Sequence, residues 1–179
     1  MTNFAIYVSL IFSVLTVVAQ IFALIIVLSL IFKKHYFSQK IIPIVRHYAF
    51  LWTFLIALGA TLGSLIYSEI IGFEPCVLCW LQRAFLYPQV IILGIALWKK
   101  DHNILDYSLG LSIIGGIFAF YQVFSQVSGI SITACTAVGG ACAKVFFIEL
   151  GYVTIPVMSF TAFLLMILFM AVKKFKIEE

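Results

Sequence analysis

Long apolar runs alternate with short polar segments along this chain. Five runs reach or approach the roughly 20 apolar residues that a helix needs to cross the hydrocarbon core of a membrane. They cover residues 4–32, 48–71, 80–98, 104–127 and 152–172. The first run contains no charged residue, whereas Glu69 lies near the end of the second and Arg83 interrupts the third. This pattern predicts an all-α integral membrane protein with five spans.

The composition agrees with that prediction. Of the 179 residues, 64% are hydrophobic and only 10% are charged, whereas ordinary soluble domains carry about 25% charged residues. The formal net charge is +4, but the basic residues lie between the apolar runs and no basic-aromatic patch occurs. We therefore interpret the charge as a determinant of membrane orientation, with the lipid bilayer as partner, and expect no nucleic-acid partner.

The basic residues predict the orientation in the membrane. Nine of the eleven follow the first, third and fifth runs: Lys33, Lys34, Lys40, Arg46, Lys99, Lys100, Lys173, Lys174 and Lys176. Because basic residues favour the cytoplasm, we expect the N-terminus outside and the C-terminus inside. The two outer connections, near residues 72–79 and 128–151, then contain every cysteine.

Polar residues of the first run share one face. Ser9, Ser13, Thr16 and Gln20 are spaced four, three and four residues apart, which places them along one side of a helix. In lipid, such a stripe is expected to face another helix, where its groups find hydrogen-bond partners. The alternative is that the serine and threonine hydroxyls bond to their own backbone. The run has no positive segment before it and no small-residue cleavage site after it, so we interpret it as a retained span rather than a signal peptide.

The four cysteines form two closely spaced pairs, Cys76 with Cys79 and Cys135 with Cys142. Four cysteines allow three pairings, and sequence proximity favours these two. Two glycines between the members of the second pair permit a sharp turn. Three interpretations remain open: a zinc site of four thiolates, structural disulfides, and redox exchange between the two pairs.

The position of the first pair favours redox exchange. Cys79 is expected at the N-terminus of the third helix, where unpaired backbone N–H groups stabilise a thiolate. Arg83 follows Cys79 by four residues and Cys76 by seven, so the three side chains project to about one face. A guanidinium there can hold a thiolate or polarise the carbonyl of an electron acceptor dissolved in the membrane. The alternative is an arginine that snorkels to lipid headgroups.

These residues carry a resemblance to a known family. The stretches "LGSLIYSE", "PCVLCWLQR" with "YPQVIILGIAL", and "GYVTIP" resemble the DsbB family of disulfide-bond formation proteins, in its short BdbC-type branch. The resemblance covers about residues 55–172. It implies a four-helix transmembrane bundle, here residues 48–179. Residues 1–47 then add an extra N-terminal transmembrane helix and a basic cytoplasmic loop.

The resemblance also implies an enzyme, a quinone-dependent protein-disulfide oxidoreductase. Such proteins reoxidise a thioredoxin-like, DsbA-type thiol oxidase outside the cytoplasm and pass the electrons to a membrane quinone, either ubiquinone or menaquinone. By position, Cys76 and Cys79 would be the catalytic pair coupled to the quinone, and Arg83 would bind the quinone. Cys135 and Cys142 would be the catalytic pair that meets the partner.

The expected location is the bacterial plasma (inner) membrane, with both cysteine pairs facing outside. The alternative class is a non-enzymatic membrane scaffold or metal-binding protein, whose cysteines are structural or bind zinc. The two classes differ in the state of the thiols. A redox enzyme holds pairs that are oxidised at rest and reducible by a partner, whereas a zinc protein holds four protected thiols and a metal.

The chain departs from the family's pattern in places. Gln82 stands where some members have glutamate before the arginine. The second cysteine pair is closer together than in long-loop members. Some members have a quinone-side histidine near the outer end of the helix that matches the fourth run. The nearest candidates here are Tyr121 and Gln122, which disfavours a histidine contact with the quinone.

Overall fold

The computed structural model describes residues 3–32, 36–101, 103–129 and 145–174. Its long helices are α1 (Asn3–Ile31), α2 (Tyr36–Leu65), α3 (Val77–Lys99), α4 (Ile104–Ser128) and α5 (Ile155–Lys174). The π-helical segment η1 (Ile66–Ile70) continues α2. Within these described ranges, five helices are long and apolar enough to cross a membrane, with the second span formed by Ile42–Ile70. The predicted all-α membrane fold with five spans is confirmed.

The start of α2 differs from the prediction. The second apolar run begins near residue 48, but α2 begins at Tyr36 and contains Pro43. Lys40 and Arg46, which were expected in a loop, therefore lie on the first turns of this helix. The reason is that hydropathy marks only the part of a helix that lies in lipid. Lysine and arginine are themselves good helix formers, so the helix continues beyond the apolar run.

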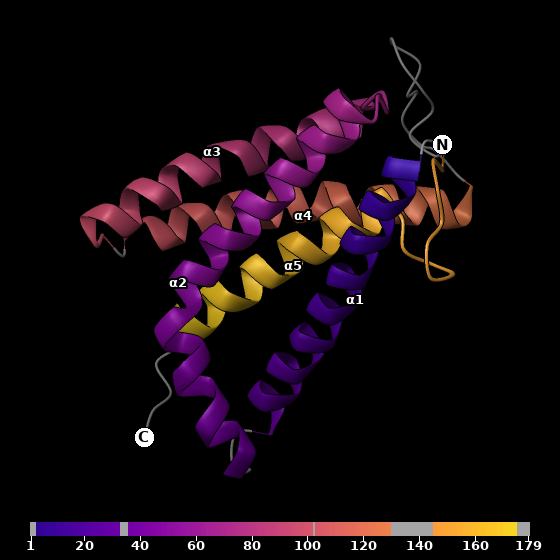
Figure 1. The fold of residues 1–179 in the computed structure, drawn as a ribbon. Helices are drawn as coiled ribbons and strands as arrows, with labels where there is room; N and C mark the ends of the chain where they lie inside the picture. The colour runs from indigo at the N-terminus through magenta and orange to yellow at the C-terminus, as the bar shows by residue number, and fades with distance from the viewer. Residues whose placement is uncertain (1–2, 33–35, 102, 130–144, 175–179) are drawn as a thin grey trace.

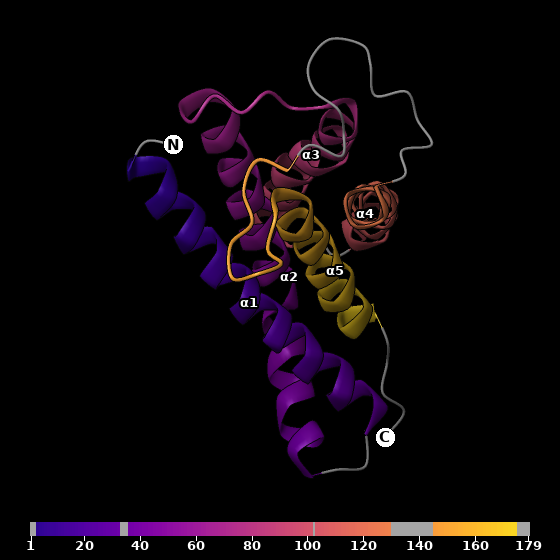
Figure 2. The same ribbon diagram turned by 90° about the vertical axis from the view of Figure 1, so that its right-hand side faces the viewer.

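Helix α5 is the centre of the bundle. It packs against α2 and α4 and, on a third side, against α1, while α3 lies against α4 and α2 (Figures 1 and 2). Helices α1 and α2 lie close at the end where the chain connects them and are well separated in the middle of the view (Figure 1), whereas nearer the other end the ring of Phe12 of α1 packs on Gly63 of α2. Helix α1 therefore lies at the edge of the bundle, where it packs against α2 and α5.

The core lies where α5 meets α2, α3 and α4. Phe163 and Met166 of α5 are fully buried, and Leu93 of α3 lies in the same cluster. The ring of Phe163 packs directly on the backbone of Gly115 in α4, where a Cβ atom would lie only 2.5 Å from the ring. Small residues at such contacts let membrane helices approach closely, since lipid itself is as apolar as the helix surfaces.

The polar stripe of α1 faces the bundle. Ser9 Oγ donates a hydrogen bond to Glu149 Oε1 at 3.0 Å, and Gln20 Nε2 donates one to Thr161 Oγ1 of α5 at 3.1 Å. The hydroxyl of Tyr152 donates a further hydrogen bond to Gln20 Oε1 at 2.5 Å. The stripe therefore binds both α5 and the segment just before it, as expected for polar groups on a membrane helix.

Candidate functional site

Cys76 and Cys79 lie together at the N-terminus of α3. Cys76 is the extended residue that precedes the helix, and its carbonyl accepts the first helical hydrogen bond from the N–H of Trp80 at 3.0 Å. Cys79 lies in the first turn, so its sulfur is 3.1 Å from that of Cys76. Both are free thiols. The hydrogen bond with Cys79 and burial raise the pKa of the Cys76 thiol, so Cys76 keeps its proton.

A chain of side-chain amides leads to the two sulfurs. The Nε2 atom of Gln122 in α4 lies 3.3 Å from Cys76 Sγ and 3.4 Å from Cys79 Sγ. Its carbonyl oxygen accepts a hydrogen bond from Gln82 Nε2 at 2.6 Å. The carbonyl oxygen of Gln82 in turn accepts one from the hydroxyl of Ser159 in α5 at 2.6 Å. Because the oxygen of the Gln122 amide accepts the hydrogen bond from Gln82, the NH2 group of the same amide is directed at the sulfurs.

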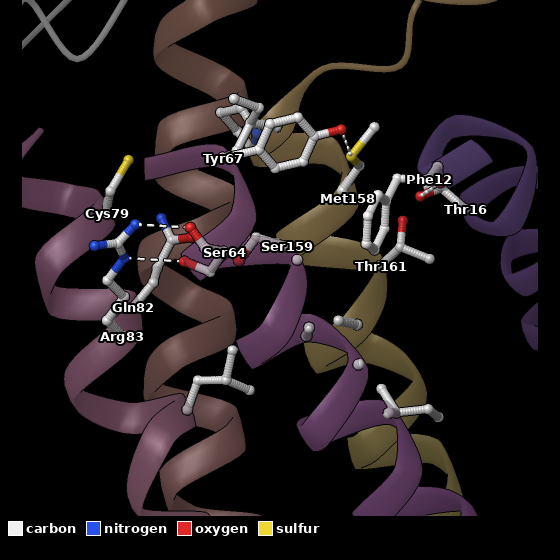
Figure 3. Close-up of a pocket in the computed structure, with 18 of the residues that line it drawn as sticks. Phe12, Thr16, Ser64, Tyr67, Cys79, Gln82, Arg83, Met158, Ser159 and Thr161 are labelled. Atoms are coloured by element: carbon white, nitrogen blue, oxygen red, sulfur yellow. Dashed lines mark hydrogen bonds between the residues drawn. The ribbon is translucent and has the colours of Figure 1, made fainter. Parts of the chain in front are cut away.

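Arg83 is buried one helical turn beyond Cys79, with 8% of its surface exposed. Its Nε donates to the hydroxyl of Ser64 in α2 at 2.9 Å, and its Nη2 donates to the carbonyl of the same residue at 3.0 Å. The guanidinium carbon lies 5.2 Å from the centre of the Trp80 ring, a cation–π contact. Figure 3 shows Cys79 and Arg83 on successive turns of α3, with the guanidinium turned toward Ser64.

The charge of Arg83 has no carboxylate partner within ion-pair distance among the described residues. A cation buried without a counter-ion is costly, and in a membrane span it indicates a functional site. The backbone next to Ser64, which accepts the hydrogen bonds of Arg83, is also unusual, because α2 widens into the π-helix η1 directly after Leu65. Such π-turns occur frequently at functional sites.

These polar groups line one end of a cavity of about 410 Å³. We call this end the polar head; it comprises Ser64, Cys76, Cys79, Gln82, Arg83 and Gln122. The rest of the cavity runs between α1, α2 and α5 and is lined mainly by apolar side chains (Figure 3). Its volume falls in the range of small-molecule sites, about 300–1,000 Å³, in which few polar groups orient a largely apolar ligand.

The structure brings three of the predicted site residues together: Cys76, Cys79 and Arg83 all line the polar head. Cys135 and Cys142 lie outside the described residues. In the part of the chain that the structure describes, no three His, Cys, Asp or Glu side chains gather in a way that could hold a metal ion.

Ser64 and Ser159 were not predicted as site residues. The sequence signal for them is weak, because serine is common in membrane helices and bonds readily to its own backbone. Tyr121 and Gln122 lie nearest the position at which some DsbB-like proteins have a quinone-side histidine. Of these two residues, Gln122 reaches the sulfurs. Tyr121 packs instead beside the cluster of Cys76 and Leu78.

Cys76 is buried and Cys79 is partly buried. A thiol pair at the head of an apolar cavity, within a bundle of membrane-spanning helices, defines a membrane protein for thiol–disulfide exchange. Sequence comparison then gives the family. The model of the family "Disulfide bond formation protein DsbB" matches residues 46–173. The chain therefore belongs to the DsbB family, whose members are membrane protein-disulfide oxidoreductases.

Curated relatives agree with this assignment. The "SPbeta prophage-derived disulfide bond formation protein B" of Bacillus subtilis (strain 168) is 47% identical over 116 residues, which cover 65% of this chain and 78% of that protein. The "Probable disulfide formation protein C" of Bacillus cereus (strain ATCC 14579) is 43% identical over 124 residues, 66% of this chain and 86% of the relative. "Disulfide bond formation protein C" of Bacillus subtilis (strain 168) is 41% identical over 124 residues, 68% and 89% respectively. No solved structure matches this chain significantly.

Proposed function

We propose that this protein reoxidises a thioredoxin-like thiol oxidase outside the cytoplasm and passes the electrons to a membrane quinone. In this proposal Cys135 and Cys142 meet the partner, and Cys76 and Cys79 reduce the quinone. The observation that carries the proposal is the polar head of the cavity. There a thiol pair lies beside Arg83, which has no carboxylate partner in the described part of the chain, at the end of an apolar space within the membrane-spanning helices.

The electrons move in two disulfide exchanges followed by one redox step. The partner's two thiols become a disulfide as the Cys135–Cys142 disulfide is reduced, through a mixed disulfide. The resulting thiols then reduce the disulfide between Cys76 and Cys79 in the same way. When these two thiols close to a disulfide again, they release two electrons and two protons. A quinone held in the polar head would supply the acceptor for both electrons and both protons.

The residues of the polar head fit a quinone. Arg83 is anchored by Ser64 through Nε and Nη2, while Nη1 makes no hydrogen bond to a described residue. Its positive charge and remaining donors suit a carbonyl oxygen on which negative charge develops. The amide of Gln122 holds the two sulfurs in place, and the surrounding wall is mainly apolar, so that the low local dielectric strengthens each of these interactions.

The proposed location is the bacterial plasma membrane, with both cysteine pairs facing outside and the N-terminus outside. The support is the charge distribution, because Lys99 and Lys174 lie at helix ends remote from the thiol pair. Basic ends favour the cytoplasm. We also propose that residues 48–179 form the redox domain and that residues 1–47 supply an added helix and a basic cytoplasmic segment. The family match from residue 46 supports this division.

The test is quinone reduction by the purified full-length protein, supplied with a reduced dithiol-bearing partner. We expect one quinol to form for each partner disulfide. Replacing Cys79 with serine should abolish quinol formation, whereas the second pair should still be able to accept electrons from the partner. The proposal would be wrong if the partner becomes oxidised at the normal rate through both cysteine pairs while no quinone is reduced.

A further inference from the structure

The cavity continues well beyond its polar head. Along α2 its lining extends from Ser64 to Trp52, a rise of roughly 18 Å at 1.5 Å per residue. We call this part the side channel; it is lined by Leu15 and Ala19 of α1, Trp52, Ile56 and Gly59 of α2, and Leu165 of α5. Its walls are apolar, and it is continuous with the site of the thiol pair. A ligand whose ring lies in the polar head therefore has this route for an apolar substituent.

One wall of the side channel comes from outside the family match. Helix α1 ends at Ile31, whereas the match begins at residue 46. Four residues of α1 line the cavity, and all lie between Phe12 and Ala19. The two polar anchors of the helix, Ser9 and Gln20, flank this stretch on either side. The hydrogen bonds of α1 therefore fix the very part of the helix that faces the cavity.

Phe12 and Gly63 mark the junction between the polar head and the wall formed by α1. The ring of Phe12 packs on Gly63, where a Cβ atom would lie 2.9 Å from it. The same ring lies 5.8 Å from the ring of Tyr67, centre to centre. One helical turn away, Gly59 lines the cavity with nothing within 4 Å of a Cβ position. The channel is therefore open beside Gly59, and a glycine there leaves its full width free.

We propose that the side channel holds the isoprenoid tail of the quinone and that α1 is its outer wall. This inference rests on the proposed function, because a tail can lie in the channel only if the ring occupies the polar head. The lining of the channel suits an isoprenoid tail, because it offers apolar contacts along its length. The channel is also continuous with the position beside Arg83, where the ring would lie. The added helix thus increases the affinity for long-tailed quinones by burying apolar surface.

A matched pair of glycine substitutions tests the channel. Gly59→Leu places a side chain in the open space of the channel. Gly110→Leu makes the same change on α4, where a Cβ also has nothing within 4 Å but where the residue does not line the cavity. The substrates are menadione, which has no tail, and a long-tailed menaquinone with the same ring; ubiquinones without and with a tail repeat the comparison.

We expect Gly59→Leu to raise KM for the long-tailed quinone by about tenfold or more relative to the tailless one. Its kcat with the tailless quinone should stay unchanged, and Gly110→Leu should leave KM and kcat unchanged for every quinone in the comparison. An unchanged KM for the long-tailed quinone in Gly59→Leu would overturn the inference, as would an equal rise for both quinones. Wild-type protein that reduces neither quinone would instead overturn the proposed function, and the inference with it.

A second measurement tests directly whether α1 contacts the tail of the quinone. A menaquinone analogue with a photoreactive diazirine on its tail is irradiated with the oxidised full-length protein, and the labelled peptides are mapped. We expect label within residues 12–19 of α1, removed by excess menaquinone and not by excess phosphatidylcholine. Label confined to α2–α5 would overturn the role of α1. Displacement by the phospholipid alone would show that the channel holds a lipid acyl chain rather than the tail.

Discussion

Replacing Gln122 with leucine tests how the bundle sets the redox behaviour of its thiol pair. The Nε2 atom of Gln122 lies 3.3 Å from Cys76 Sγ and 3.4 Å from Cys79 Sγ. Leucine has a similar size but no N–H group, so the sulfurs lose both donors. A hydrogen bond to a charged group contributes about 1.5–3 kcal/mol. The donors favour the reduced pair, in which one sulfur can carry negative charge.

The substitution should therefore destabilise the reduced pair relative to the disulfide and make the reduction potential more negative. For a two-electron couple, about 1.4 kcal/mol corresponds to 30 mV, so we expect a shift of about 30–60 mV. Gln82 also loses its acceptor, the oxygen of Gln122 at 2.6 Å. That second cost falls on both redox states alike, so it lowers the melting temperature rather than the potential.

The assay equilibrates the purified protein in dithiothreitol redox buffers and traps the thiols with a maleimide, with the other two cysteines replaced by serine. Gln89→Leu is the matched control. Gln89 is also fully buried, and its oxygen accepts hydrogen bonds from Ser108 and Ser112, with no contact to a sulfur. The control should lower the melting temperature without changing the potential. Equal potentials in Gln122→Leu and wild type would refute the reasoning.

Three further predictions concern the remaining parts of the proposal. Arg83→Lys should slow quinone reduction about a hundredfold, because lysine lacks the planar, forked donors of arginine. Exchange between the cysteine pairs should continue. If the rate depends on quinone concentration in the same way in Arg83→Lys and wild type, Arg83 is a lipid anchor and has no part in the mechanism. Cys142→Ser should trap a mixed disulfide between Cys135 and the partner, or the reverse substitution should trap it on Cys142, as read by non-reducing electrophoresis; capture only on Cys76 or Cys79 would reverse the assigned order. After reduction of intact cells, a membrane-impermeant thiol reagent should label both pairs, and labelling only after membrane rupture would contradict the proposed orientation.

Local features of the sequence were enough to predict the five spans and part of the site. A membrane span requires an unbroken apolar stretch of about 20 residues, so hydropathy alone locates it. Cys76, Cys79 and Arg83 fall within two helical turns, and helical periodicity brings them to one face whatever the neighbouring helices do. Hydropathy failed at Tyr36, because a helix that leaves the lipid remains a helix.

The partners of these residues depend on the tertiary structure. Ser64, Gln122 and Ser159 come from three different helices, and nothing in their local sequence shows that they face α3. In the stripe of α1, the prediction of hydrogen-bond partners is confirmed for Gln20 but wrong for Ser13, whose buried hydroxyl has no partner among the residues that the structure describes. The physical reason is that in a membrane the lipid-facing and protein-facing sides of a helix are almost equally apolar. The sequence therefore determines which segments span the membrane, whereas only the packing of the helices decides which faces meet and where a cavity remains.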